Sequence, residues 1–356
     1  MRAPTAPQDV RWRRIAALIG TLAVGFAGGI LARQLRMPLP WLLGPLFMTA
    51  ALGLGGAPIC PVGRARTIGQ VVVGTSLGLQ FTQAILLKLL LLTPLIVGIT
   101  VVSTVIGAIG ALMLVALTGL DRKTAFFATT SGGVVEMANI AARHHAELEP
   151  IAVVHTMRVA FIVVAAPLLV IGFSGAAGTV APLPYVPWLI LIALLVIGAV
   201  VGFAINYYDL PNAWFLGPLA VAAIFATLGL VEGRAPDMLL IAAQVFMGTS
   251  LGTQFRKEFL TRLLPLMLRA SLVILFTTGA NAAIGVGLAY LLGYPVATMV
   301  LALVPGGMAE MVLTAKLLNL DAMVVMGFQL LRIVMVLVLA EISFRLFIRF
   351  TGPGRE

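Results

Sequence analysis

Cysteine, histidine and charged side chains are all scarce in this chain of 356 residues. Cys60 is the only cysteine, there are three histidines, and charged residues make up 10% of the sequence. A lone cysteine excludes a disulfide framework and a cysteine-based metal site. An ordinary soluble domain is about one quarter charged, so this chain has too few polar side chains to coat a globule of its size. We expect no metal site, no cofactor and no catalytic residue.

Apolar sequence is what the chain has in abundance. Hydrophobic residues make up 61%, and the mean hydropathy is +1.10. The apolar runs extend over the whole length, and most approach the roughly 20 residues that a helix needs to cross the hydrocarbon of a bilayer. Backbone polar groups must be satisfied inside lipid, so these spans are helices, and the alternation of a β-barrel is absent. The sequence therefore predicts an all-α polytopic membrane protein.

The basic charge is explained by the membrane. The formal net charge is +10, but the lysines and arginines lie in short loops between apolar runs. No basic stripe, helix-turn-helix or zinc motif indicates nucleic acid as a partner. The partner we expect is the lipid bilayer. The first apolar run follows four arginines and is interpreted as a retained span, because no cleavage site of a signal peptide follows it.

The chain contains an internal repeat. Residues 70–81 (QVVVGTSLGLQF) and 244–255 (QVFMGTSLGTQF) match at nine of twelve positions, at an offset of 174. Three more pairs share this spacing or one shorter by a single residue: SGGVVEM (131–137) with PGGMAEM (305–311), PWLLGPL (40–46) with AWFLGPL (213–219), and Arg158 with Arg332. Collinear matches at one spacing predict two tandem membrane repeats, 1–178 and 179–356.

Each repeat carries six apolar segments. In the first repeat they are 15–32, 41–57, 67–86, 92–118, 124–142 and 151–173, and in the second 187–206, 214–231, 239–255, 265–293, 296–317 and 322–348. Two segments per repeat are irregular. The GTSLG segments place small and hydroxylated residues in mid-run, which predicts a broken helix. The paired glycines, Gly132–Gly133 and Gly306–Gly307, predict a re-entrant hairpin.

Topology follows from the positive charges. If the Gly-Gly segments are re-entrant, 16 of the lysines and arginines outside the spans fall on one side and five on the other. If all segments cross, or if the GTSLG segments are re-entrant instead, the split is nearly even. The positive-inside rule selects the first solution. It gives five crossings per repeat, inverted repeats, and both termini in the cytoplasm at the inner membrane.

Two carboxylates occupy matching positions in the Gly-Gly segments. Glu136 and Glu310 each lie within an apolar run, where a charge costs about 2.5–3.5 kcal/mol on insertion scales. We interpret them as a site for a coupling ion, a proton or a substrate. The alternative is a carboxylate that fixes the hairpin through a neighbouring arginine.

Two arginines and a histidine lie within spans. The interpretation we favour for Arg158 and Arg332 is a structural ion pair with Glu136 and Glu310, and the alternative is binding of an anionic substrate. His155 precedes Arg158 by one turn. A ring bonded to the backbone is favoured for it over a proton relay.

Polar residues around the GTSLG glycines form the third candidate group: Thr75, Ser76, Gln80, Thr249, Ser250 and Gln254. We interpret them as lining a site for a solute or ion, beside an unwound backbone. The alternative is close helix packing, because Gly74 and Gly78 have the spacing of small residues that lets two helices touch.

The duplicated GTSLG-x-QF and GG-x-x-EM blocks, each preceded by W-x-L-GP, resemble the AbrB family of bacterial inner-membrane proteins. The resemblance covers essentially the full chain, although the SGG of the first repeat becomes PGG at Pro305. It implies a multi-pass membrane protein, distinct from the small soluble DNA-binding regulator that shares the name. The family carries two labels, a regulator of aidB expression and an ammonia monooxygenase, and neither assigns a substrate or site residues.

The leading hypothesis is a secondary transporter or exporter of a small solute, such as an organic anion or other metabolite, coupled to protons or sodium ions. A membrane-embedded regulator of gene expression is the alternative. An enzyme is the least favoured class, because oxygen activation needs several histidines and carboxylates around a metal, and the three histidines all lie in one repeat. The oligomeric state is left open, with a homodimer as one option.

Overall fold

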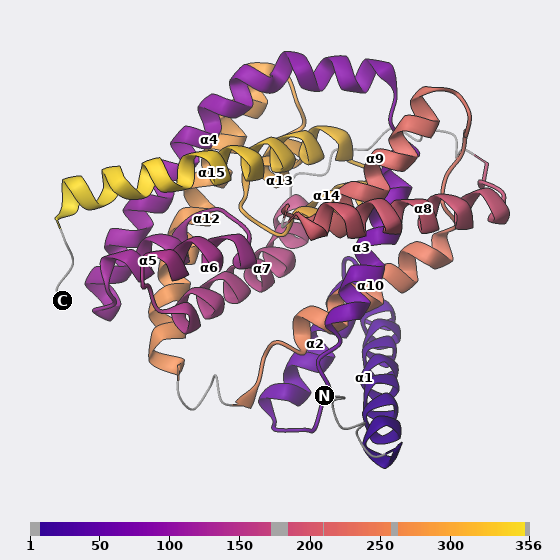
Figure 1. Cartoon of the computed structure of the whole chain (residues 1–356), viewed down its shortest axis with the longest axis horizontal. Helices are drawn as coiled ribbons and strands as arrows, with labels where there is room; N and C mark the ends of the chain where they lie inside the picture. The colour runs from indigo at the N-terminus through magenta and orange to yellow at the C-terminus, as the bar shows by residue number, and fades with distance from the viewer. Residues whose placement is uncertain (1–7, 172–183, 209, 258–262, 353–356) are drawn as a thin grey trace, which may run out of the picture. The chain divides into compact units, whose positions relative to one another are not determined.

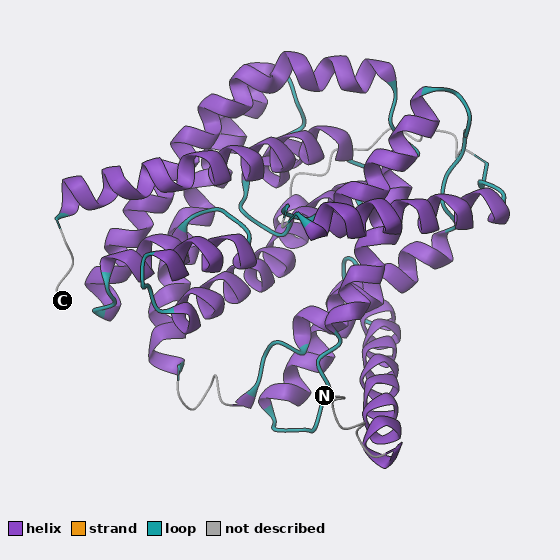
Figure 2. Ribbon diagram, viewed as in Figure 1, coloured by secondary structure: helices purple, strands orange, loops and turns teal. Residues whose placement is uncertain are grey.

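The computed structural model describes residues 8–171, 184–208, 210–257 and 263–352, and these ranges fold into α-helices (Figures 1 and 2). Within these ranges, Tyr185 and Arg234 also form an isolated β-bridge. The fold class predicted from the sequence, an all-α polytopic membrane protein, is confirmed.

The order of the helices is the same in the two sequence repeats. The first repeat contains α1 (Gln8–Gln34), α2 (Pro40–Leu54), α3 (Gly63–Gly78), α4 (Gln83–Thr118), α5 (Arg122–Thr129), α6 (Val134–Arg143) and α7 (Leu148–Ile171). The second contains α8 (Trp188–Tyr207), α9 (Ala213–Thr227), α10 (Asp237–Gly252), α12 (Leu264–Leu292), α13 (Val296–Leu303), α14 (Met308–Leu317) and α15 (Ala322–Thr351). Four matching pairs have identical lengths of 15, 16, 8 and 10 residues.

Six of the described helices are long and apolar enough to cross a membrane: α1, α4, α7, α8, α12 and α15. Their outward faces are apolar. Leu91 on α4 is 73% exposed and Val338 on α15 is 63% exposed. Large exposed apolar surfaces of this kind are unfavourable in water and suited to contact with lipid.

Four helices are shorter than a membrane span, so the predicted five crossings per repeat stay a prediction. α2, α3, α9 and α10 contain 15 or 16 residues. At 1.5 Å per residue they are about 23 Å long, while the hydrocarbon core is about 30 Å thick. Five crossings per repeat would require these helices to span a locally thinned layer.

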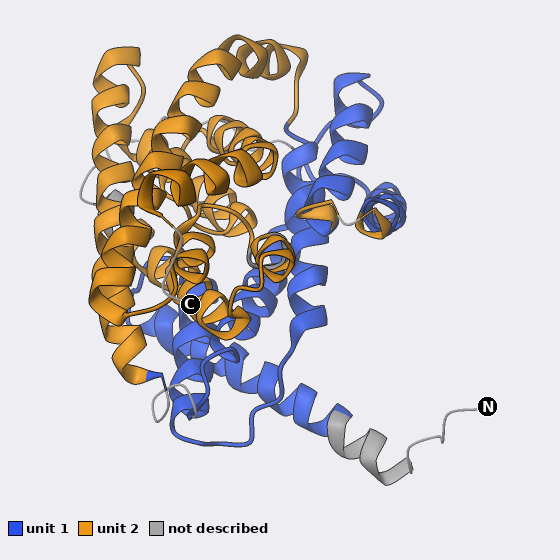
Figure 3. Cartoon of the chain, turned by 60° about the vertical axis from the view of Figure 1, so that its left-hand side comes forward, with its two compact units in different colours: residues 1–80, 183–205, 214–263 blue, residues 81–182, 206–213, 264–356 orange. Residues whose placement is uncertain are grey.

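The described helices form two compact units (Figure 3). Unit 1 contains the first three helices of each repeat, α1–α3 and α8–α10, and unit 2 contains α4–α7 and α12–α15. Each unit therefore combines helices from both sequence repeats. The predicted division at residue 178 describes the duplication of the chain, and as a division into domains it stays a prediction.

In unit 1, each of the two GTSLG motifs packs a glycine directly against the backbone of a neighbouring helix. A Cβ atom added at Gly74 of α3 would lie 2.4 Å from the carbonyl oxygen of Phe215 in α9. A Cβ atom added at Gly248 of α10 would lie 2.2 Å from the carbonyl oxygen of Leu42 in α2. Each motif thus contacts the W-x-L-GP helix of the other repeat, with backbone against backbone.

The GTSLG segments differ from the expectation of a helix broken inside the motif. α3 stays helical to Gly78 and α10 to Gly252, and each helix ends at the last glycine of its motif. At that residue an added Cβ would again lie 2.4 Å from Leu219 O and 2.5 Å from Leu46 O, respectively. The glycines provide close approach between helices, which leaves the helical hydrogen bonds intact.

We predict that Gly74→Ala destabilises the protein by about 1–3 kcal/mol, because its methyl group has no space against the α9 backbone. Gly98→Ala is the matched control, since Gly98 lies in α4 with nothing within 4 Å of its added Cβ. Thermal unfolding of the purified proteins in detergent measures both. Equal melting temperatures for the two variants would contradict the packing role.

Candidate functional site

Unit 2 contains two interrupted helices at equivalent places in the repeats. α5 and α6 are separated by residues 130–133, and α13 and α14 by residues 304–307 (Figure 1). Each interruption is extended: φ/ψ are −59°/137° at Thr130 and −62°/130° at Val304. The half-helices contain only 8 and 10 residues, about 12 and 15 Å, so neither half crosses a bilayer alone. The re-entrant course of these segments stays a prediction.

The glycine pairs serve packing rather than an unusual backbone conformation. The N-cap glycines Gly133 and Gly307 have φ of −74° and −67°, which any residue can adopt. A Cβ atom at Gly132 would lie 2.6 Å from the side chain of Met137, and one at Gly306 would lie 2.8 Å from Met311. The buried methionine of each GG-x-x-EM block therefore occupies the space that the first glycine leaves open.

In the first repeat a buried arginine caps the interrupted helix. Arg158 of α7 is 5% exposed, and its Nη1 and Nη2 atoms donate to the carbonyl oxygens of Thr130 (2.8 Å) and Gly132 (3.0 Å). Its Nη2 also lies 3.0 Å from Nδ1 of His155. Because arginine only donates, Nδ1 accepts, so Nε2 carries the proton and donates to Phe127 O at 2.9 Å. Three carbonyl groups around the end of α5 thus receive hydrogen bonds from side chains.

The second repeat has the same arrangement, with a glutamine in place of the histidine. Arg332 of α15 is 5% exposed, and its Nη1 donates to the carbonyl oxygens of Leu303 (3.0 Å) and Val304 (3.2 Å). Its Nη2 donates to Oε1 of Gln329, whose amide nitrogen donates to Leu301 O (2.9 Å) and Val304 O (3.1 Å). Gln329 thus does what His155 does in the other repeat.

These contacts give the two arginines a structural role. The last carbonyl groups of a helix have no partner within the helix, and they carry the negative end of its dipole. In an apolar interior each unsatisfied carbonyl costs about 1–3 kcal/mol, so a guanidinium group that binds several of them stabilises the break. The ion pairs that we expected with Glu136 and Glu310 stay predictions. For His155, the structure shows the favoured arrangement, a ring bonded to the backbone.

Glu310 lies at the third position of α14 and is fully buried. Its Oε2 atom lies 2.0 Å from where a Cβ atom of Gly307 would be, so the carboxylate folds back over the N-terminus of the helix. A negative charge is favourable at this position because of the helix dipole. Glu136 has the same place in α6, and its side chain is outside the part that the structure describes.

The polar residues of the GTSLG motifs lie in unit 1, whereas the Gly-Gly segments lie in unit 2. The hydroxyl-bearing side chains in α3 and α10 are buried: Thr75, Ser76, Thr249 and Ser250. The Oγ1 atoms of Thr75 and Thr249 have no hydrogen-bond partner, while Gln80 Nε2 donates to Ser76 O at 3.5 Å. Gln254 follows the end of α10. No single unit contains both candidate groups.

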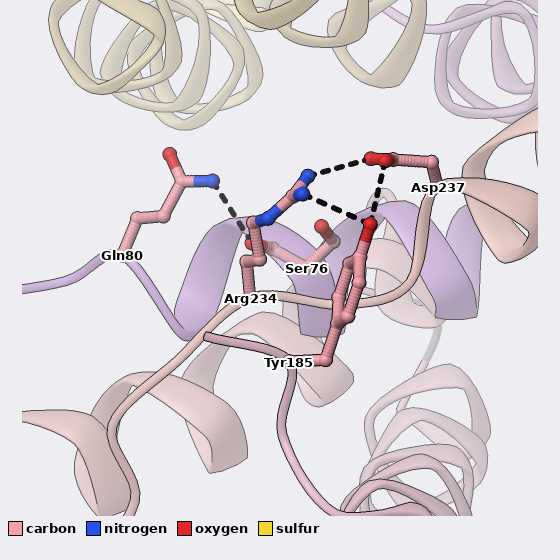
Figure 4. A network of polar contacts seen from close by, with 5 residues as sticks. All are labelled: Ser76, Gln80, Tyr185, Arg234 and Asp237. Atoms are coloured by element: carbon pink, nitrogen blue, oxygen red, sulfur yellow. Dashed lines mark hydrogen bonds and ion pairs between the residues drawn. The ribbon is translucent and has the colours of Figure 1, made fainter. Parts of the chain in front are cut away.

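A polar cluster that sequence reasoning missed lies in unit 1, before α8 and α10 (Figure 4). Arg234 donates to Asp237 Oδ1 at 2.7 Å and to the hydroxyl of Tyr185 at 2.9 Å, and its guanidinium group stacks over the Tyr185 ring at 4.3 Å. The hydroxyl donates to Asp237 Oδ2 at 2.9 Å, and this bond raises the pKa of Tyr185. Because the tyrosine and arginine are 49 residues apart and have no counterpart in the first repeat, no spacing signal predicts them.

A second missed cluster joins the beginnings of α4 and α15 in unit 2. Lys88 Nζ lies 2.8 Å from Asp321 Oδ2 and 4.9 Å from the centre of the Tyr294 ring. Asp321 also accepts from the backbone N–H of Val324, so it caps α15. The pair connects helices from different repeats, which the apolar pattern of either helix cannot reveal.

We predict that Arg332→Met lowers the free energy of unfolding by about 1–3 kcal/mol, because it removes the side-chain donor to Leu303 O at the end of α13 and one of the donors to Val304 O. Arg345→Met is the matched control, since this arginine lies on the same helix with a side chain that is 77% exposed. Denaturant unfolding in mixed micelles measures the difference between the two variants. A loss at Arg332 no larger than that at Arg345 would remove the capping role.

The difference between the repeats can be tested by giving the first repeat the residue that the second repeat has at the equivalent position. His155→Gln introduces the residue that the second repeat has at Gln329, so it is expected to cost less than about 1 kcal/mol. His155→Leu removes the donor to Phe127 O and the acceptor for Arg158, and it is expected to cost about 2–3 kcal/mol.

Comparison with known proteins places the chain in a family. The model of the family described as "Transition state regulatory protein AbrB" matches residues 55–348. The chain is 25% identical to "Uncharacterized protein YhjN" of Bacillus subtilis (strain 168) over 94% of each sequence. It is also 25% identical to "Putative regulator AbrB" of Escherichia coli (strain K12) over 98% of this chain and 99% of the relative. Because the family model covers most of its length, this chain belongs to the AbrB family.

Proposed function

We propose that this chain is a secondary transporter of a small organic anion or similar metabolite, driven by a proton or sodium gradient. The observation that carries the proposal is the pair of interrupted helices in unit 2, each capped by a buried arginine at an equivalent position of the repeat. Discontinuous helices that meet within a duplicated membrane fold are characteristic of transporter binding sites.

The interruptions of the two repeats lie near each other in unit 2. α7, which carries Arg158, also packs against α13 and α14. A Cβ atom at Gly306 would lie 2.9 Å from Ile162 of α7. Arg158 and Arg332 cap the two interruptions from α7 and α15. Two buried cations in unit 2 favour a negatively charged solute.

Coupling is assigned to the carboxylates. Glu310 is fully buried at the N-terminus of α14, beside the glycine pair, and Glu136 has the equivalent position in α6. A carboxylate in this setting can take up a proton or contact a sodium ion when the half-helix moves. The GTSLG residues, Thr75 and Thr249 among them, form a separate candidate group within unit 1, where their hydroxyls are buried.

The orientation belongs to the same proposal. We place both termini in the cytoplasm, at the inner membrane, because this leaves only five lysines and arginines outside. A phosphatase reporter inserted after Gly178, which is outside the described residues, is then expected to be active, and the same reporter at the C-terminus inactive. An inactive reporter at Gly178 would exclude the inverted arrangement.

Transport is tested with the purified chain in lipid vesicles. We expect uptake of at least one anion from a panel of labelled carboxylic acids when a proton or sodium gradient is imposed. Glu310→Gln is expected to reduce the gradient-driven rate at least tenfold, because the neutral side chain cannot exchange a charge. Glu149→Gln, which changes an exposed carboxylate in the first turn of α7, is the control. Failure of every anion under both gradients would reject the proposal.

A membrane-embedded regulator is the second candidate, favoured by the printed name of the Escherichia coli relative. A transporter can affect gene expression by changing a metabolite pool, whereas a direct regulator needs no transport. A Glu310→Gln variant that loses transport separates the two: it also loses the effect on expression in the first case and keeps it in the second.

A further inference from the structure

A crevice in unit 2 lies between α4, α13 and α15. It is partly open and has room for one water-sized group. Most of its lining is apolar, from residues such as Leu303 and Phe328, and its polar lining consists of Thr100, Ser103 and Arg332. Among the described residues that line it, none is a carboxylate.

Two polar atoms of this lining are buried without a hydrogen-bond partner. Ser103 is 2% exposed and its Oγ has no partner, and Arg332 is 5% exposed and its Nε has none. The hydroxyl of Thr100, in contrast, already donates to Ile96 O at 2.7 Å. Buried polar atoms are almost always satisfied, so an unsatisfied pair on one crevice indicates a missing partner.

The chemistry of the two groups defines that partner. The Nε–H of arginine can only donate, and the serine hydroxyl has a free proton to donate. The other guanidinium nitrogens are bound to carbonyl groups and to Gln329, so none of these bonds neutralises the positive charge. An anion that accepts from both donors gains charge-assisted hydrogen bonds in an apolar setting, which a water molecule does not provide.

We propose that this crevice is an anion subsite, in which Arg332 Nε–H and Ser103 O–H donate to one halide ion or to one oxygen of a carboxylate group. The equivalent donors would be Thr277 of α12 and Arg158 of α7, and of these only the Nε of Arg158 is without a hydrogen-bond partner. The residue equivalent to Ser103 is Thr277, and its hydroxyl already donates to Val273 O at 3.0 Å. The proposed subsite therefore occurs once, between α4 of the first repeat and α13 and α15 of the second, and it binds one anion per chain.

The test is thermal unfolding of the full chain in detergent, with sodium bromide or sodium acetate titrated against the bulky sulfonate anion of MES at constant ionic strength. We expect the melting temperature to rise with bromide, acetate or both. A response to bromide identifies an inorganic ion as the occupant, and a response to acetate alone identifies the carboxylate of an organic solute. If the melting temperature in bromide and in acetate equals that in the MES anion, the proposal is overturned and the crevice is assigned to a water molecule.

Variants locate the effect. Ser103→Ala removes one donor, and the concentration of anion needed for half of the shift is expected to rise about tenfold. Ser271→Ala in α12 is the control, because its hydroxyl is bound to Met267 O at 2.8 Å. An unchanged half-saturation in Ser103→Ala would also overturn the assignment.

A second measurement needs no variant. The chlorine NMR line of chloride is expected to broaden with wild-type protein and to narrow again when bromide or acetate is added in excess. A line that does not broaden excludes a halide as the occupant, and it overturns the subsite if acetate also leaves the melting temperature unchanged. Both measurements detect binding without movement, so the subsite and the proposed transport are tested separately.

Discussion

The need to satisfy backbone carbonyl groups in an apolar interior is the constraint on which the interrupted helices depend. The residues where α5 and α13 end are buried, so the carbonyl groups there need donors from elsewhere in the fold. Arg158 and Arg332 supply them from α7 and α15. Each guanidinium group binds two carbonyls at once, and His155 or Gln329 binds further carbonyls beside it.

This solution has consequences for how the molecule can work. A break held by side chains from a neighbouring helix connects the motion of the half-helices to that of α7 and α15. The repeats differ at one position of the cap, where His155 corresponds to Gln329, and at one lining residue of the proposed anion subsite, where Ser103 corresponds to Thr277. The two repeats are therefore equivalent in the order of their helices and unequal in their polar side chains.

Packing in unit 1 follows a different principle. No hydrophobic force draws apolar helices together in lipid, so close approach must come from small residues. Gly74 and Gly248 place the backbones of α3 and α10 directly against the W-x-L-GP helices of the other repeat. The duplication is thus used to build one unit from two copies, because each copy supplies the partner that the other needs.

The amino-acid sequence by itself determined the helical class, the membrane setting, the twelve apolar segments and the equivalence of the repeats, since these depend on hydropathy and on local motifs. It left open two roles for the GTSLG glycines and for His155, and in the structure those glycines pack against a neighbouring helix and the His155 ring binds the backbone. It also could not show that the arginines bind carbonyl groups, or that Tyr185 meets Arg234. Only the tertiary structure decided these points, because a hydrogen bond depends on which helices lie side by side, and an apolar helix shows nearly the same pattern on every face.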